Sequence, residues 1–104
     1  INIGQTVNGS LGPGDPTRQN GAHFDEYTFN GFNNQLVRIT LTSPAFDTFL
    51  ILIESSGTVT ENDDMAQGNL NSFIQRTLSG AGTHRIRVSS FHPNVQGNYT
   101  LRLE

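Results

Sequence analysis

Four side chains with oxygen ligands gather in the middle of the sequence and could together bind a cation. Asn62, Asp63 and Asp64 are consecutive, and Asp47 comes just before the apolar segment that precedes them. Carboxylate and amide oxygens are the hard ligands that calcium prefers, at about six to eight per ion. One interpretation of Asp47, Asn62, Asp63 and Asp64 is therefore a calcium site.

The other interpretation of the same residues is structural. In an EF-hand register, Asn62, Asp64 and Ala66 would supply the first three ligands, and the Ala66 side chain has no oxygen. Asp and Asn side chains in turns also accept hydrogen bonds from nearby backbone N–H groups. We favour this interpretation, in which Asp63 and Asp64 cap a turn and no cofactor is needed.

A second acidic group is a weaker candidate for a metal site. It combines Asp15, in a Gly- and Pro-rich segment, with Asp25 and Glu26 at the start of a strand-like segment. These residue types are common in turns, which accounts for them without a metal. Asp15 and Asp25 therefore stand second to the first group.

No pattern of catalytic residues is present in the sequence. His23, His84 and His92 do not have the spacing of an HExxH zinc motif. No serine lies in a Gly-x-Ser-x-Gly turn, and nothing joins a serine to a histidine and an aspartate. His84 shares a predicted strand face with Ile86 and Val88, so we expect it to be structural. The sequence predicts a protein that is not an enzyme.

The elements that would position these groups are short β-strands. The apolar run 49–53 lies between Asp-Thr and Ser-Ser-Gly and is too short for an ordinary helix. It predicts a strand in the middle of the fold, covered on both faces. Residues 36–42 alternate, with Val37, Ile39 and Leu41 on one face, as in a half-buried antiparallel strand. The other strand-like segments are 6–11, 24–29, 58–61, 72–78, 83–89 and 97–103.

About eight short strands with Gly-rich turns and no amphipathic helix indicate an all-β fold. We predict a two-sheet antiparallel β-sandwich with a jelly-roll-like or Greek-key topology. A chain of 104 residues supports one core, since it buries roughly 60–70% of the surface that its unfolded form exposes. Residues 1–104 are therefore expected to form a single domain.

The composition excludes several classes of partner. The chain has no cysteine and no lysine, and six arginines against nine acidic residues give a net charge of −3. This charge gives no electrostatic basis for binding nucleic acid, whose phosphates attract basic surfaces. The longest apolar run is five residues, whereas a spanning helix needs about 20, so no membrane span is predicted.

Two kinds of exposed group could contact a partner. Four arginines point outward from predicted strands and form either a basic patch or, as we favour, ion pairs with acidic neighbours. Three phenylalanines near turns either form an aromatic binding surface or plug the ends of the core. The residues are Arg38, Arg85, Arg87 and Arg102, and Phe32, Phe46 and Phe91.

Six segments, in order along nearly the whole chain, carry a family pattern. They are 4–11 (GQTVNGSL), 24–29 (FDEYTF), 46–50 (FDTFL), 62–64 (NDD), 82–88 (GTHRIRV) and 97–101 (GNYTL). Each is a common β-strand phrase alone, and their order is more specific. Together they resemble the bacterial pre-peptidase C-terminal domain family, and are distantly similar to the clostridial collagen-binding domains.

The resemblance implies a non-catalytic accessory module of a secreted bacterial protein, often a peptidase, that aids export, folding or attachment to a substrate or surface. The implied location is extracellular or in the cell envelope. The implied partners are a neighbouring domain of the same chain and an extracellular protein or polysaccharide. The collagen-binding relatives bind calcium near the positions of Asp15 and Asp25, which leaves a calcium-stabilised jelly-roll module binding carbohydrate or protein as the alternative.

Overall fold

The computed structural model describes residues 1–63 and 70–104, which form β-strands and no helix. The strands are β1 (Thr6–Leu11), β2 (Phe24–Gly31), β3 (Leu36–Thr42), β4 (Thr48–Ile53), β5 (Val59–Asn62), β6 (Ser72–Thr77), β7 (Gly82–Ser90) and β8 (Gly97–Leu103). The predicted strands are confirmed, with shifts of one or two residues at their ends. The described residues contain no helix long and apolar enough to cross a membrane.

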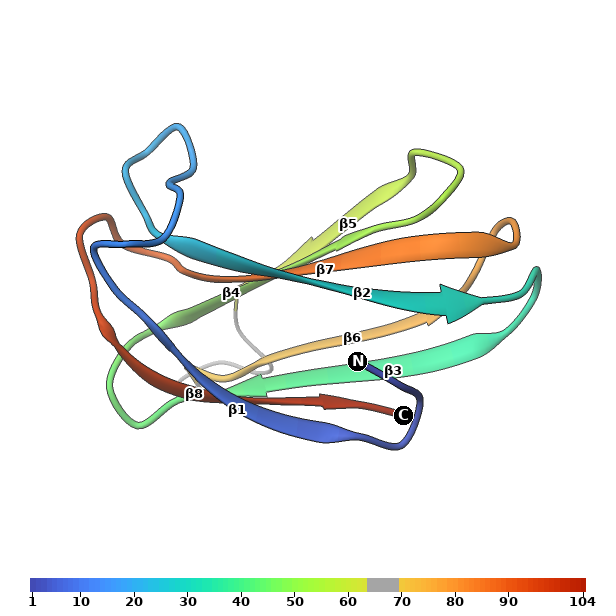
Figure 1. Ribbon diagram of the computed structural model, residues 1–104, viewed down its shortest axis with the longest axis horizontal. Helices are drawn as coiled ribbons and strands as arrows, with labels where there is room; N and C mark the ends of the chain where they lie inside the picture. The colour runs from blue at the N-terminus through green and yellow to red at the C-terminus, as the bar shows by residue number, and fades with distance from the viewer. Residues whose placement is uncertain (64–69) are drawn as a thin grey trace.

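The strands form two antiparallel sheets of four that stack as a sandwich (Figure 1). The first sheet has the order β1-β8-β3-β6, and the second has the order β2-β7-β4-β5. From β1 to β7, each strand except β4 is followed in sequence by a strand of the other sheet, and the resulting order is that of a jelly roll. The predicted fold class and topology are therefore confirmed.

The core lies between the two sheets and follows from the alternation along each strand. In β3 the exposed Leu36 and Arg38 alternate with inward residues, and β8 repeats the pattern around Arg102. Burial of each large aliphatic side chain contributes about 1.5–3 kcal/mol. The inward residues of these two strands are Val37, Ile39, Leu41, Tyr99, Leu101 and Leu103, all at most 2% exposed.

Strand β4 lies inside its sheet, between β7 and β5, as its apolar run predicted. Its inner residues, Leu50 and Leu52, have no exposed surface. On the outer face Ile51 is only 7% exposed and lies between Arg87 of β7 and Glu61 of β5. Long charged side chains cover apolar neighbours with their methylene groups. Side chains, rather than a further layer of backbone, therefore cover the second face of β4.

A buried carboxylate joins two turns at one end of the sandwich. Glu54 follows β4 and is 2% exposed. It accepts hydrogen bonds from Arg76 Nε at 2.8 Å, from the Ser79 backbone N at 2.7 Å and from the Ser79 hydroxyl at 3.2 Å. The turn after β4 is thereby fixed to β6 and to the turn that follows β6.

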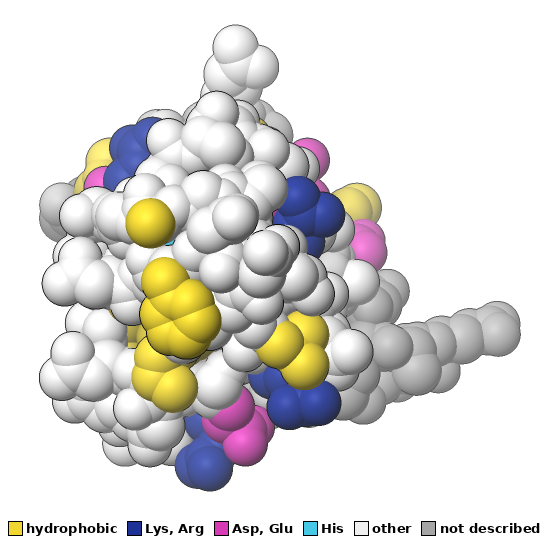
Figure 2. All heavy atoms as spheres, turned by 90° about the vertical axis from the view of Figure 1, so that its right-hand side faces the viewer, with side chains coloured by type: hydrophobic (Ala, Val, Ile, Leu, Met, Phe, Trp, Pro, Cys, Tyr) yellow, Lys and Arg dark blue, Asp and Glu magenta, His cyan; other side chains and the backbone are white. Residues whose placement is uncertain are grey.

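The three phenylalanines near turns do not form one surface. Phe46 is 7% exposed and belongs to the core. Phe32, 63% exposed, lies in the β2–β3 turn at the end where β7 begins, and apolar side chains are visible on that end of the molecule (Figure 2). Phe91 follows the last residue of β7 and so lies at the opposite end. Of the two alternatives, a surface shared by all three is wrong, because an extended nine-residue strand separates Phe32 from Phe91.

Candidate functional site

Three residues of the first predicted calcium site, Asp47, Asn62 and Asp63, reach the same end of the sandwich. Thr48, next to Asp47, contacts the Ser72 hydroxyl at 2.6 Å, and that hydroxyl donates to the Asp63 carbonyl at 2.8 Å. Asn62 Oδ1 accepts a hydrogen bond from the Phe73 backbone N at 3.2 Å. The Asn62 oxygen is therefore already engaged in holding the start of β6.

The fourth member of that group, Asp64, lies outside the described residues. Within residues 1–63 and 70–104, no three histidine, cysteine, aspartate or glutamate side chains lie together as a metal site would require. Calcium at Asp47, Asn62, Asp63 and Asp64 stays a prediction.

The second acidic group is partly assembled. Asp25 Oδ2 accepts a hydrogen bond from the Tyr99 hydroxyl at 2.6 Å, and that hydroxyl lies 2.5 Å from the Tyr27 hydroxyl. Asp15 Oδ2 accepts from the Gly12 backbone N at 3.0 Å. Burial raises the pKa of Asp25; the Tyr99 hydrogen bond opposes this shift, and the nearby Asp15 carboxyl adds to it. Two carboxylates thus lie close together between the β1–β2 loop and β2.

Glu26 does not join this group, because neighbouring residues of a strand point to opposite faces. It lies instead with the outward arginines of β7: Arg85 and Arg87 contact its Oε1 at 3.6 Å and 2.9 Å. The favoured interpretation of the arginines as ion-paired residues is confirmed for Arg85, Arg87 and Arg102 but not for Arg38, and such exposed pairs contribute at most about 1 kcal/mol each. On the other sheet Arg102 pairs with Glu104, and Arg38 donates to Gln75.

His84 is structural, as its strand position predicted. It has no exposed surface, and its ring lies 5.2 Å from that of Phe29. Its Nδ1 accepts a hydrogen bond from the backbone N of Ser55, whereas the Ser55 hydroxyl donates to the Ala81 carbonyl. Its Nε2 is also buried, and it has no hydrogen-bond partner within residues 1–63 and 70–104.

The loop between β1 and β2 folds back onto the end of β7 through one arginine. Arg18 begins a tight turn in which its backbone N donates to the Ala22 carbonyl at 2.8 Å. Its Nε donates to Ser89 Oγ at 2.9 Å, and its terminal NH2 donates to the Ser90 carbonyl at 2.7 Å. Burial lowers the pKa of Arg18, and the negative charge of Glu61 opposes this shift. These bonds hold the guanidinium in one place.

One aromatic ring lies over this guanidinium, and two further rings follow it through ring–ring contacts. Its carbon lies 4.3 Å from the centre of the Phe49 ring, within the range of a cation–π contact. The Phe49 and Phe91 rings are 6.4 Å apart, and the His92 ring meets Phe91 edge-on at 5.1 Å. Phe91 is 43% exposed. We call Arg18, Phe49, Phe91 and His92 the aromatic–arginine surface.

Sequence reasoning identified only Phe91 of this surface. The apolar run 49–53 predicts a covered Phe49, and alternation shows only that its side chain faces outward, not what lies beside it. Arg18 stands in a loop with no local signal, and more than 70 residues separate it from Ser89 and Ser90. Its contacts depend on the pairing of β2 with β7, a tertiary feature.

Comparisons with known proteins agree with the fold. A solved structure, the pre-peptidase C-terminal domain of a collagenase from Bacillus anthracis, superimposes with a TM-score of 0.75 at 23% sequence identity. The match covers 100% of this chain and 91% of that domain. No family model and no curated protein sequence matches the chain. The resemblance drawn from the six sequence segments is thus confirmed at the level of the fold.

Proposed function

We propose that this chain is a non-catalytic accessory module of an exported protein and that it attaches the parent protein to an extracellular protein. The likeness to the pre-peptidase C-terminal domain of a collagenase supports this proposal. The observation that carries it is the aromatic–arginine surface. Exposed aromatic rings and arginines are the groups most enriched at the energetic centres of protein interfaces.

The geometry of the surface suits a protein ligand. Arg18 is fixed by two hydrogen bonds and by the Phe49 ring, so it loses little conformational freedom when a partner binds. Phe91, whose ring centre lies 6.4 Å from that of Phe49, presents an exposed apolar face that can pack against an aliphatic or proline side chain of the ligand. The Arg18 guanidinium, on the Phe49 ring, can donate to a carbonyl or carboxylate of the same ligand.

We expect Phe91→Ala to lower the affinity for a protein ligand by at least about tenfold, or about 1.4 kcal/mol, because it removes the exposed ring. The measurement is binding of the labelled chain to immobilised collagen, with cellulose as a polysaccharide matrix for comparison. Phe32→Ala is the matched control, since Phe32 is more exposed but lies at the other end of the sandwich. Equal binding to collagen by Phe91→Ala and wild type would contradict the proposal.

A structural calcium ion is a second candidate, carried by the Asp15 and Asp25 carboxylates. Both are hard oxygen ligands, and their proximity together with burial raises the pKa of Asp25. A cation would remove this unfavourable interaction and fix the β1–β2 loop to β2. Two carboxylates are fewer than the six to eight oxygens that calcium takes, so carbonyl groups or water would supply the rest.

We expect Asp25→Asn to be at least as stable as wild type at neutral pH in EDTA. A raised pKa means that the ionised carboxylate destabilises the folded state, and this cost is absent below the pKa of the unfolded chain and appears as the pH rises through the folded pKa. If calcium binds, excess calcium should raise the melting temperature of the wild type by about 10 °C and leave Asp25→Asn unchanged. Superimposable melts of the wild type with and without calcium would exclude this site.

A further inference from the structure

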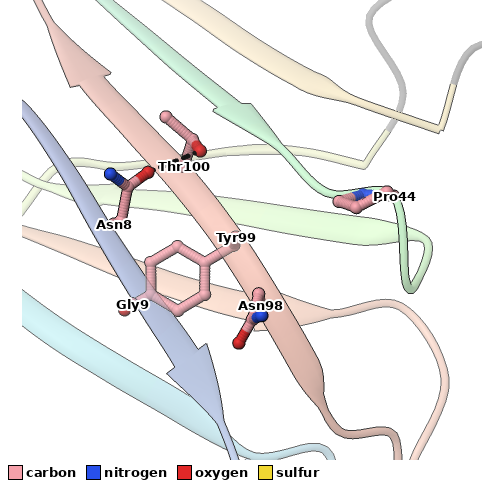
Figure 3. Close-up of a pocket in the computed structure, with 6 residues that line it drawn as sticks. All are labelled: Asn8, Gly9, Pro44, Asn98, Tyr99 and Thr100. Atoms are coloured by element: carbon pink, nitrogen blue, oxygen red, sulfur yellow. Dashed lines mark hydrogen bonds between the residues drawn. The ribbon is translucent and has the colours of Figure 1, made fainter.

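The outer face of the first sheet carries a pocket that the aromatic–arginine surface does not reach. It has a volume of about 530 Å³, within the range of small-ligand sites of about 300–1,000 Å³. It lies over β1 and β8, beside the turn that follows β3 (Figure 3). The lining residues are Asn8, Gly9, Pro44, Asn98, Tyr99 and Thr100.

The pocket is built on two rows of cross-strand neighbours. Asn8 of β1 is paired with Thr100 of β8, and Ser10 is paired with Asn98. Between the rows, Gly9 and Tyr99 turn inward, and the Tyr99 ring is directed toward Gly9 (Figure 3). The floor of the pocket is therefore backbone, and its walls are amide and hydroxyl side chains.

The polar side chains of the walls have hydrogen-bond donors and acceptors that are not used within the described residues. Thr100 Oγ1 donates to Asn8 Oδ1 at 2.8 Å, which fixes the Asn8 amide and leaves its NH2 group free to donate. The Asn98 side chain has no hydrogen-bond partner among residues 1–63 and 70–104, so its carbonyl and its NH2 group are both available. The pocket thus offers donors and an acceptor within one small area.

The rim at Pro44 is held in place by β8. Ser43 Oγ donates to the Asn98 carbonyl at 2.6 Å and accepts from the Ala45 backbone N at 3.0 Å. Gly97 permits this approach, because a Cβ at that position would lie 2.5 Å from the Ala45 Cβ. The pocket is therefore formed before any ligand arrives, which lowers the entropic cost of binding.

We propose that this pocket binds a neutral saccharide. None of the lining side chains is charged at neutral pH, so an ionic ligand would lose its hydration without gaining a counter-charge. An apolar ligand would bury the Asn8 and Asn98 amides without partners, at a cost of about 1–3 kcal/mol each. Vicinal hydroxyls of a sugar ring both donate and accept, which matches side-chain amides, and the Pro44 ring can contact the C–H face of the sugar. This site is independent of the attachment surface proposed above.

The test is a titration of the isotope-labelled chain with cellohexaose, followed by amide chemical shifts in NMR spectra. We expect saturable shifts confined to the Asn8 and Asn98 side chains and the backbone of Gly9, Tyr99 and Thr100, with a dissociation constant of about 1 mM. An oligogalacturonate of the same length, which adds carboxylates to the same ring, should cause no such shifts.

Variants locate the binding energy. Asn98→Ala should weaken cellohexaose binding by about tenfold or more. Asn30→Ala, an exposed asparagine on β2 of the other sheet, should bind like wild type, and so should Phe91→Ala. The absence of shifts at about 20 mM cellohexaose, shifts that map elsewhere, or wild-type affinity in Asn98→Ala would overturn the proposal. Because Phe91→Ala separates the two surfaces, either proposal can fail without the other.

Discussion

Glu54→Ala should lower the free energy of unfolding by about 3 kcal/mol, because it removes a buried carboxylate and leaves a partly buried backbone N–H and an arginine without their partner. The Glu54 carboxylate is 2% exposed and is held by Arg76 and by both donors of Ser79. A domain of this size is stable by only about 5–15 kcal/mol, so the loss is a large fraction of the total. The measurement is denaturant unfolding at neutral pH.

The same carboxylate makes stability depend on pH in a defined direction. Burial disfavours the charge of Glu54, but the Ser79 and Arg76 hydrogen bonds outweigh it and hold the pKa of Glu54 below its ordinary value. Its contribution is therefore complete above the pKa of the unfolded chain and is lost as the pH falls through the lowered folded pKa. Glu54→Gln should have a flatter stability profile over this acidic range.

Glu26→Gln is the matched control for both experiments. Glu26 also pairs with arginines, but its side chain is 34% exposed, so its removal should cost less than about 1 kcal/mol. If Glu54→Ala proved no more destabilising than Glu26→Gln, the buried carboxylate would not be a link between the turns.

Gly9→Val should destabilise the fold by about 3 kcal/mol through overpacking. A Cβ at Gly9 would lie 2.5 Å from the Tyr99 hydroxyl oxygen and 2.6 Å from the ring carbon that bears it. Tyr99 cannot move aside easily, because its hydroxyl is bonded to Asp25 and contacts that of Tyr27. Burial raises the pKa of Tyr99, and the Asp25 hydrogen bond adds to the shift, so the hydroxyl remains a donor.

Thermal and denaturant melts of Gly9→Val are to be compared with those of Gly14→Ala. A Cβ at Gly14 meets no atom within 4 Å, so that change should stay within about 0.5 kcal/mol of wild type. Equal stability of the two variants would mean that β1 and β8 do not approach as closely as the Gly9–Tyr99 contact requires.

The sequence predicted best what local pattern determines. The alternation in 36–42 and 97–103 gave the bounds of β3 and β8, and the short apolar run identified β4 as an interior strand. The order of the strands in each sheet could not be predicted in this way. The pairing of β1 with β8 joins segments about ninety residues apart, and no local pattern encodes which strands become neighbours.

Some candidate sites could likewise be predicted from the sequence, and others depend on the folded structure. The grouping of Asp15 with Asp25 could be drawn from the sequence because a loop leads directly into β2, although strand alternation takes Glu26 to the other face. The roles of Arg18 and Glu54 could not be predicted from the sequence. Arg18 contacts the end of β7, and Glu54 contacts Arg76, only after the sheets have formed. The pocket at Asn8 and Asn98 likewise exists only once β1 lies beside β8.

The most direct test of the attachment proposal is co-sedimentation of the chain with insoluble collagen fibrils, with released peptides assayed in the same supernatant. We expect saturable sedimentation, at least about tenfold weaker for Phe91→Ala and unchanged for Phe32→Ala, with no release of peptides. Failure of the wild type to sediment with the fibrils would contradict attachment to protein. Release of peptides that disappears on heat inactivation would contradict a non-catalytic module.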